Sequence, residues 1–265
     1  MYYLERTLAA LRMLAEDPRV VYDRLRARVG MRAERLTEMP LGLYAARSWE
    51  AALVVLEARL GPVAEVLEEP ELRTVEAQLQ RWFSNADLRG APFPCDFNAD
   101  RHLARLCYAV CRLLKPAIAV ETGVAFGVTS AYVLKALEKN GGEGALHSVD
   151  LPPLHAKGAE RFVGAAIPGD LRGRWSLYRG ASKRVLPGLL GATGGADVFV
   201  HDSLHTYRNM RREFETVMPR MRAGGMIVAD DIGNNRAFEE LKQSTRLWIP
   251  IEGAEENATF GIALK

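Results

Sequence analysis

The sequence predicts an α/β protein: a doubly wound, mostly parallel seven-stranded sheet with an antiparallel C-terminal hairpin, preceded by a helical N-terminal region. Short apolar runs alternate with amphipathic stretches in the second part of the chain, which is typical of parallel strands joined by helices. Only a short glycine-containing loop separates the last two runs, so these two strands are expected to be antiparallel. Residues 1–90 have helical periodicity almost throughout.

The composition is that of a globular protein and gives no signal for nucleic acid or membrane. The 265 residues are 48% apolar and 26% charged, enough to bury a core, and the formal net charge of +2 does not favour a nucleic-acid partner. No apolar run is long enough to cross a bilayer, and the N-terminus lacks the pattern of a signal peptide. The odd count of three cysteines fits a reducing compartment, so we expect a cytoplasmic protein.

Residues 1–95 are predicted to form a helical region that covers a pocket or mediates homo-oligomerisation. Helices are expected at residues 48–60 and 62–83, where apolar residues recur at helical spacing on either side of Gly61-Pro62. An earlier helical stretch is rich in arginine, which indicates either a solvated face or a surface for an anionic partner or a partner subunit. These arginines are Arg19, Arg24, Arg26, Arg28, Arg32 and Arg35.

A boundary is predicted within residues 84–98, which are rich in proline, glycine and turn formers. The domain that follows, residues 96–265, is expected to begin with a helix at 99–114 that ends at Lys115-Pro116. Strands are then expected at residues 117–120, 145–149, 175–178, 198–200, 226–229, 247–251 and 259–264. The helices between the first five strands are expected at residues 128–139, 155–166, 182–190 and 206–222.

The first three strands end in residues suited to a ligand. The first runs into Glu121-Thr122-Gly123, and with Gly127 these glycines allow close approach of backbone to a ligand at the start of a helix. The spacing matches neither a dinucleotide fingerprint nor a phosphate-binding P-loop. The second strand ends in Asp150, which could accept hydrogen bonds from two ribose hydroxyls or could instead cap a helix. A tight turn follows the third strand.

This order of motifs resembles the Rossmann-like S-adenosylmethionine-dependent methyltransferases. The segment from Glu121 to Gly127 looks like their first motif, Asp150 looks like their ribose-binding acid, and the C-terminal hairpin is similar to theirs. The resemblance covers about residues 97–265 and implies S-adenosylmethionine as the cofactor. It assigns Glu121, Thr122, Gly123 and Gly127 to the amino-acid part, Asp150 to the ribose, Ala181 and Ser182 to the neighbourhood of the adenine, and Asp202 to the methyl group.

Three carboxylates follow the fourth and fifth strands. Asp202 comes directly after the fourth strand, and Asp230 and Asp231 come directly after the fifth. Since the carboxyl ends of parallel strands meet at one sheet edge, these acids are expected to cluster, and clustered carboxylates favour a divalent metal between them. All-oxygen ligands suit Mg²⁺ or another hard cation. Alternatively, the acids cap the turns that follow. His205 could act as a base beside the metal.

A narrower resemblance concerns the same residues. Metal-dependent O-methyltransferases of the catechol and sugar types place one Asp after the fourth strand and an acidic pair after the fifth. This resemblance implies Asp202, Asp230 and Asp231 as metal ligands, and His205 and Asp202 as catalytic residues. His205 stands where catechol-type enzymes have a lysine and where sugar-type enzymes have a histidine. The sequence departs from the Asp-Gly-Asp-His-Ser-Tyr segment of related enzymes at positions 203 and 204, the latter a leucine in place of the second Asp.

We therefore expect an O-methyltransferase that acts on a hydroxyl of a small molecule, either a sugar or a natural-product intermediate, with a divalent metal and His205 as general base. One alternative is metal-independent transfer to nitrogen or oxygen, with His205 alone as base. A nicotinamide oxidoreductase is disfavoured by the glycine spacing and by the absence of a Tyr-x-x-x-Lys pair. A non-catalytic cofactor-binding scaffold is disfavoured because it has no use for clustered carboxylates, which are costly to fold.

Overall fold

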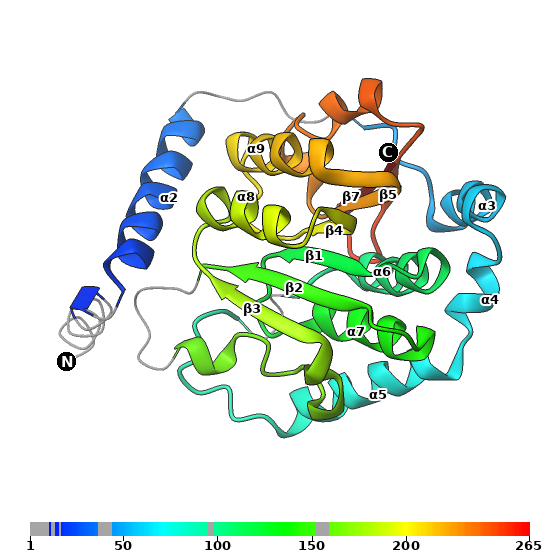
Figure 1. The fold of residues 1–265 in the computed structure, drawn as a ribbon, viewed down its shortest axis with the longest axis horizontal. Helices are drawn as coiled ribbons and strands as arrows, with labels where there is room; N and C mark the ends of the chain where they lie inside the picture. The colour runs from blue at the N-terminus through cyan, green and yellow to red at the C-terminus, as the bar shows by residue number, and fades with distance from the viewer. Residues whose placement is uncertain (1–10, 12–13, 16, 37–43, 95–97, 152–158) are drawn as a thin grey trace.

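A computed structural model describes residues 11, 14–15, 17–36, 44–94, 98–151 and 159–265. It contains a seven-stranded sheet in the order β3-β2-β1-β4-β5-β7-β6 (Figure 1). The first five strands are parallel, and β7 is antiparallel to both of its neighbours, which confirms the predicted α/β class and the C-terminal hairpin. The strands are β1 (Ile118–Thr122), β2 (Ala145–Asp150), β3 (Trp175–Arg179), β4 (Ala196–His201), β5 (Met221–Ala229), β6 (Leu247–Glu252) and β7 (Thr259–Leu264).

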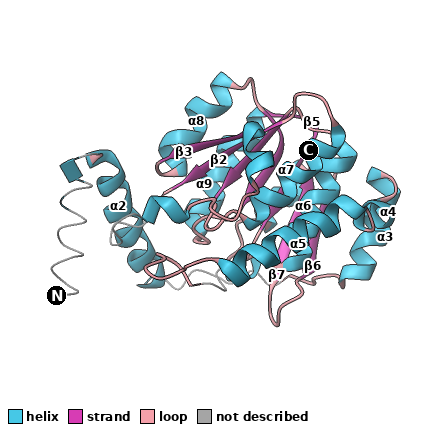
Figure 2. Cartoon of the chain, turned by 90° about the horizontal axis from the view of Figure 1, so that it is seen from below, coloured by secondary structure: helices cyan, strands magenta, loops and turns pink. Residues whose placement is uncertain are grey.

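Helices cover both faces of this sheet (Figures 1 and 2). The α-helices of the described chain are α2 (Pro18–Leu36), α3 (Trp49–Leu60), α4 (Val63–Leu67), α5 (Pro70–Asn85), α6 (Arg101–Leu114), α7 (Val128–Asn140), α8 (Ser182–Ala192) and α9 (Tyr207–Val217). Short 3-10 turns occupy Ala159–Phe162, Gly169–Arg174, Met218–Arg220, Ile232–Asn234 and Glu239–Ser244.

The central strands are buried on both faces, as their continuous apolar runs require. In β4, Val198 and Val200 belong to the core that α3 to α7 complete, whereas Phe199 belongs to the core beneath α8 and α9. This alternation follows from the period of two along a strand. Helices α3 to α5 therefore share a core with the sheet. The separate role expected for residues 1–95, as a lid or an oligomer interface, stays a prediction.

Two predicted helices are shorter in the structure. The stretch at 62–83 divides into α4 and α5, because Pro70 starts a new helix and cannot continue the preceding one. The stretch at 206–222 ends as an α-helix at Val217, and Pro219 lies in the 3-10 turn that leads into β5. Strand β5 then begins at Met221, earlier than expected.

The helix expected at 155–166 is wrong for its described part. Residues 152–158 lie outside the described residues, and Ala159–Phe162 forms a 3-10 turn. Gly164 follows with a φ of 69°, a left-handed conformation that ends a helix. No helix of the described chain is both long and apolar enough to cross a membrane.

The exit of β1 passes very close to the exit of β4. Thr122 and His201 are the last register partners of the two strands, and Gly123 continues with a φ of 83°. A Cβ atom at Gly123 would lie 1.9 Å from the carbonyl oxygen of Asp202. Only glycine combines this backbone conformation with so close an approach, so Gly123 determines how near the two strand ends can come.

We predict that Gly123→Ala lowers the free energy of unfolding by roughly 2 kcal/mol or more, because a side chain there meets backbone atoms and has an unfavourable φ. The matched control is Gly188→Ala, since Gly188 lies in α8 with no atom within 4 Å of an added Cβ. The control should leave stability unchanged or raise it by up to about 1 kcal/mol. Urea unfolding measures both. Equal stability of the two variants would contradict the close approach.

Candidate active site

The sheet's own hydrogen bonds place the first two carboxylates. The Asp202 N–H donates to the carbonyl oxygen of Thr122 at 2.8 Å, which continues the β1–β4 ladder. The Asp230 N–H donates to the carbonyl oxygen of His201 at 2.9 Å, which continues the β4–β5 ladder. Both aspartates are therefore fixed directly past their strands at the same edge of the sheet, as the sequence predicts.

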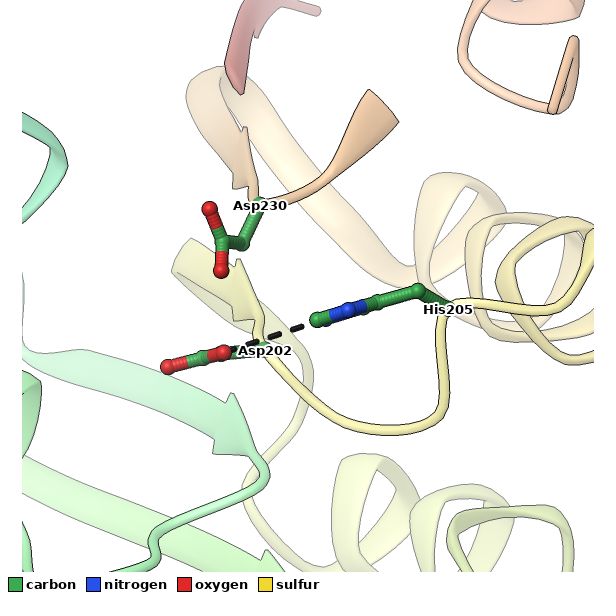
Figure 3. Close-up of side chains that lie close together, drawn as sticks. All are labelled: Asp202, His205 and Asp230. Carbon is green, nitrogen blue, oxygen red and sulfur yellow. Dashed lines mark ion pairs between the residues drawn. The ribbon is translucent and has the colours of Figure 1, made fainter. Parts of the chain in front are cut away.

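Asp202, Asp230 and His205 converge at this edge. One side-chain ligand atom from each residue lies within 4.8 Å of the other two. Figure 3 shows the two carboxylates and the imidazole gathered in front of the ends of β4 and β5, with an ion pair of 3.8 Å between His205 Nε2 and Asp202 Oδ1. Two carboxylate oxygens and one imidazole nitrogen form a plausible ligand set for a divalent cation.

Asp231 is not a member of this group of three. Its backbone has a φ of 49°, and its carboxylate lies 2.9 Å from His205 Nδ1. His205 thus lies beside Asp202 and Asp230, and the Asp231 carboxylate pairs with the Nδ1 atom of the His205 imidazole. The expected role of Asp231 as a metal ligand stays a prediction. With Nδ1 donating to Asp231, the buried Nε2 of His205 is left without a hydrogen-bond partner among the described residues.

The charges of the cluster shift the pKa of each member. Burial and the charge of Asp230 raise the pKa of Asp202 well above its usual range. Burial raises the pKa of Asp230 as well, although the charge of His205 opposes it. Burial lowers the pKa of His205, but the hydrogen bond to Asp231 and the surrounding carboxylates outweigh this effect and raise it overall. A cation between Asp202 and Asp230 would relieve their repulsion, so these residues fit a metal.

A buried carboxylate that sequence reasoning missed holds the loop of this site. The His201 Nδ1 atom and the Thr122 hydroxyl both lie 2.6 Å from Glu213 Oε2. The other oxygen of Glu213 accepts hydrogen bonds from the Ser203 hydroxyl at 2.8 Å and the Asn209 side-chain amide at 3.0 Å. Glu213 therefore connects the ends of β1 and β4, the loop after β4 and helix α9.

The residues expected at the cofactor end lie at the same sheet edge but not all in the cavity. Asp150 Oδ2 accepts a hydrogen bond from the Val124 N–H at 2.9 Å and so braces the glycine loop. Glu121 is 1% exposed, and its Oε2 atom accepts hydrogen bonds from the hydroxyls of Ser130 and Ser148 at 2.6 and 2.7 Å. Burial raises the pKa of Glu121 to about 7. Its expected contact with a cofactor stays a prediction.

The start of α8 is already engaged by other parts of the chain. The Ser182 side chain is hydrogen-bonded to Glu213. The Ala181 N–H donates to Asp23 Oδ2 of α2 at 3.2 Å. Neither Ala181 nor Ser182 lines the main cavity, so their expected place near an adenine also stays a prediction.

A cavity of about 340 Å³ lies in front of the carboxylates. Its described lining contains five carboxylates and no lysine or arginine. Asp100 anchors one wall, because its Oδ2 accepts hydrogen bonds from the Ala254 and Glu255 N–H groups at 2.7 and 3.0 Å. The lining residues are Asn98, Ala99, Asp100, Val124, Ala125, Val128, Thr129, Asp202, Ser203, Leu204, His205, Asp230, Asp231, Glu255 and Ala258.

Comparison with known proteins identifies the fold of this site. One similar structure is a protein from Klebsiella pneumoniae that is provisionally assigned as an O-methyltransferase. It is 18% identical to this chain, with a TM-score of 0.54, and the match covers 82% of this chain and 96% of that protein. The O-methyltransferase TomG from Streptomyces achromogenes, involved in tomaymycin synthesis and solved with S-adenosylmethionine, has 19% identity and a TM-score of 0.52, over 82% and 96%. An O-methyltransferase from Bacillus cereus, solved with S-adenosylhomocysteine, has 14% identity and a TM-score of 0.51, over 82% and 98%. No curated protein sequence matches the chain.

A family model described as a methyltransferase domain matches residues 120–232. The matched segment begins inside β1 and ends just past the acidic pair, so it contains the glycine loop, Asp150 and the whole acidic cluster. These residues also occupy the carboxyl edge of the sheet, where α/β proteins of this type bind their ligands. Residues 120–232 are therefore similar to a methyltransferase domain, and the surrounding chain has the fold of the O-methyltransferase structures.

Proposed function

We propose that the protein transfers a methyl group from S-adenosylmethionine to a hydroxyl of a small molecule, with help from a divalent cation at Asp202 and Asp230. The observation that carries this proposal is a shared cavity. The glycine loop, through Val124 and Ala125, lines the same space as the carboxylates and His205. A cofactor on the loop would thus face the cluster directly.

The glycine loop and the start of α7 offer donors for the amino-acid part of the cofactor. Helix α7 has Gly127 at its N-cap and no side-chain cap, and Val128 and Thr129 of its first turn line the cavity. The free N–H groups of a helix start bind a carboxylate well. Asp202 lines the same cavity as this helix start and His205, which suits the expected position of the methyl group.

Asp202 and Asp230 would hold the cation. His205 is close enough to be a third ligand, but its Nε2 atom could not then accept a proton, so the role as base assigns the cation to the two carboxylates. When bound, a divalent cation lowers the pKa of a coordinated hydroxyl and orients it. Their raised pKa values support this role, because two buried carboxylates without a cation repel each other. If Asp202 and Asp230 are the protein ligands, Mg²⁺ stays the predicted ion. An imidazole ligand would favour a softer metal.

His205 is placed to accept the proton of the acceptor hydroxyl. The hydrogen bond from Nδ1 to Asp231 orients the ring and leaves Nε2 at 3.8 Å from Asp202 Oδ1, and both residues line the cavity. In the transfer step the proton moves to Nε2, a bond forms between the acceptor oxygen and the methyl carbon, and the bond from that carbon to sulfur breaks. The protein then holds S-adenosylhomocysteine, the methyl ether and a protonated imidazole.

The lining of the cavity favours an acceptor that is neutral or positively charged. Asp100 is neutralised by helix and loop N–H groups, and Asp231 pairs with His205. Glu255 forms no ion pair with the described residues, and no lysine or arginine of the described chain lines the cavity. A carboxylate or phosphate on the acceptor would therefore meet uncompensated negative charge. A polyhydroxylated or amine-bearing molecule, such as a sugar, fits best.

Calorimetry with S-adenosylhomocysteine tests the cofactor. We expect binding to the wild-type protein and a loss of about tenfold or more in affinity for Asp150→Ala, which removes the expected acceptor of the ribose hydroxyls. Asp197→Asn is the matched control, because Asp197 is a carboxylate at the opposite edge of the sheet that also accepts a backbone N–H, from Ile118 at 2.8 Å. The control should bind normally. Absence of binding to the wild type would refute the proposal.

The roles of Asp230 and His205 should separate in two measurements. Asp230→Asn should weaken Mn²⁺ binding, followed by electron paramagnetic resonance, because it removes a charged ligand. His205→Asn should retain S-adenosylhomocysteine binding and lose roughly 10²- to 10⁴-fold in turnover, the usual contribution of a general base. If turnover resists chelators and Asp230→Asn leaves Mn²⁺ binding unchanged, the metal-independent alternative holds instead. Unchanged turnover in His205→Asn would exclude this histidine as the base.

Acceptor charge can be tested with triads of hydroxylated compounds that differ only in one neutral, ammonium or carboxylate group, such as glucose, glucosamine and glucuronate and similar sets. We expect carboxylate members to be poorer acceptors by about tenfold or more, because the cavity is acidic. Glu255→Gln should reduce this difference, whereas Glu256→Gln, a neighbour outside the cavity lining, should not. Preferential methylation of the carboxylate members would show that the acidic lining does not select the substrate.

A further inference from the structure

Helix α2 lies across the edge of the sheet at which the cofactor would bind. In Figure 1 it stands to one side of the sheet, beyond the ends of β2 and β3. Val20 and Val21 are buried on its inner face, and Asp23 is 12% exposed. Its outer face is exposed, with Tyr22 at 58% and Val29 at 69%. The helix is thus attached along one face only.

Two acidic residues of α2 bind the starts of two other helices. Asp23 Oδ2 accepts hydrogen bonds from the Ala181 N–H at 3.2 Å and from Arg184 Nε at 2.9 Å. Glu34 accepts a hydrogen bond from the Tyr207 N–H at the start of α9. Helix α8 has no side-chain cap of its own, so Asp23 supplies the negative charge that its N-terminus favours.

These contacts fall on the groups expected to bind the adenosine. Ala181 and Ser182 begin α8 at the expected adenine position, and Asp150 is the expected ribose acid. Arg24, next to Asp23, is close enough that its charge and that of Asp150 act on each other. The cavity includes the glycine loop and the acidic cluster but none of Asp150, Ala181 and Ser182. The open space therefore matches the methionine half of the cofactor, and α2 lies over the adenosine half.

We propose that α2 competes with the cofactor: in this structure Asp23 occupies the place expected for the adenine, and S-adenosylmethionine binds only when α2 moves away. This inference rests on the proposed function, because it assumes that the adenosine lies along Asp150 and Ala181. Under competition, the apparent affinity equals the intrinsic affinity multiplied by the fraction of molecules in which α2 is displaced. A loosened α2 must then bind the cofactor more tightly.

Competition predicts a gain in affinity from two separate substitutions. Asp23→Asn weakens the contact of α2 at the adenosine position. Glu34→Gln weakens the contact of α2 with the start of α9, and this contact involves no residue that is expected to bind the cofactor. We expect each to raise the affinity for S-adenosylhomocysteine by roughly threefold to tenfold in the full-length protein, measured by calorimetry. Arg32→Gln is the control, because Arg32 lies on the exposed side of α2 and should leave the affinity unchanged.

Hydrogen exchange gives a second measurement on the wild-type protein. Saturating S-adenosylhomocysteine should make the amides of α2 exchange faster if the cofactor displaces the helix. Slower exchange in α2, together with weaker binding by Asp23→Asn and Glu34→Gln, would overturn the proposal, because α2 would then close over the bound cofactor. Affinities equal to that of the wild type would overturn it too. If no variant and no wild-type protein binds S-adenosylhomocysteine, the proposed function itself fails.

Discussion

The buried carboxylate of Glu213 is the interaction on which the rest of the site depends. Burial alone would raise the pKa of Glu213, but the charge and hydrogen bond of His201 outweigh it and lower the pKa to about 2. An ionised and fully buried group is stable only when its partners satisfy it completely. The partners of Glu213 come from β1, β4 and the loop after β4, so satisfying this one charge fixes the backbone that presents Asp202 and His205.

The sheet and the position of Asp202 and Asp230 could be predicted because both follow from the backbone. A strand that is buried on both faces can be recognised in the sequence as an apolar run. A residue directly past such a strand lies at the carboxyl edge of the sheet, whatever its side chain. The role of Asp231 could not be predicted in this way. Its left-handed conformation turns the carboxylate toward His205 Nδ1, and nothing in the Asp230-Asp231 pair reveals which of the two will turn.

Glu213 and α2 show two different reasons why sequence reasoning was incomplete. Glu213 left a signal, since it lies on the apolar face of α9 beside Met210 and Phe214, where an acid requires a buried partner. Asp23 left none. An acidic residue on an arginine-rich helix is ordinary, and its partner, Ala181, is 158 residues away along the chain. The break before Pro70 could be predicted locally, but the partners of α2 depend on the assembled sheet.

The attachment of α2 follows from the geometry of a parallel sheet. Helices α8 and α9 both begin at the carboxyl edge, so their N–H groups and the strand-end carboxylates share one surface. A helix that bridges both starts needs two acids at the right separation. Asp23 and Glu34 are eleven residues apart (34 − 23), close to three helical turns, so they lie on the same side of α2 and roughly 16 Å apart along it. The observed position of α2 satisfies both helix starts at once, and it places Asp23 against Ala181, where the adenine is expected.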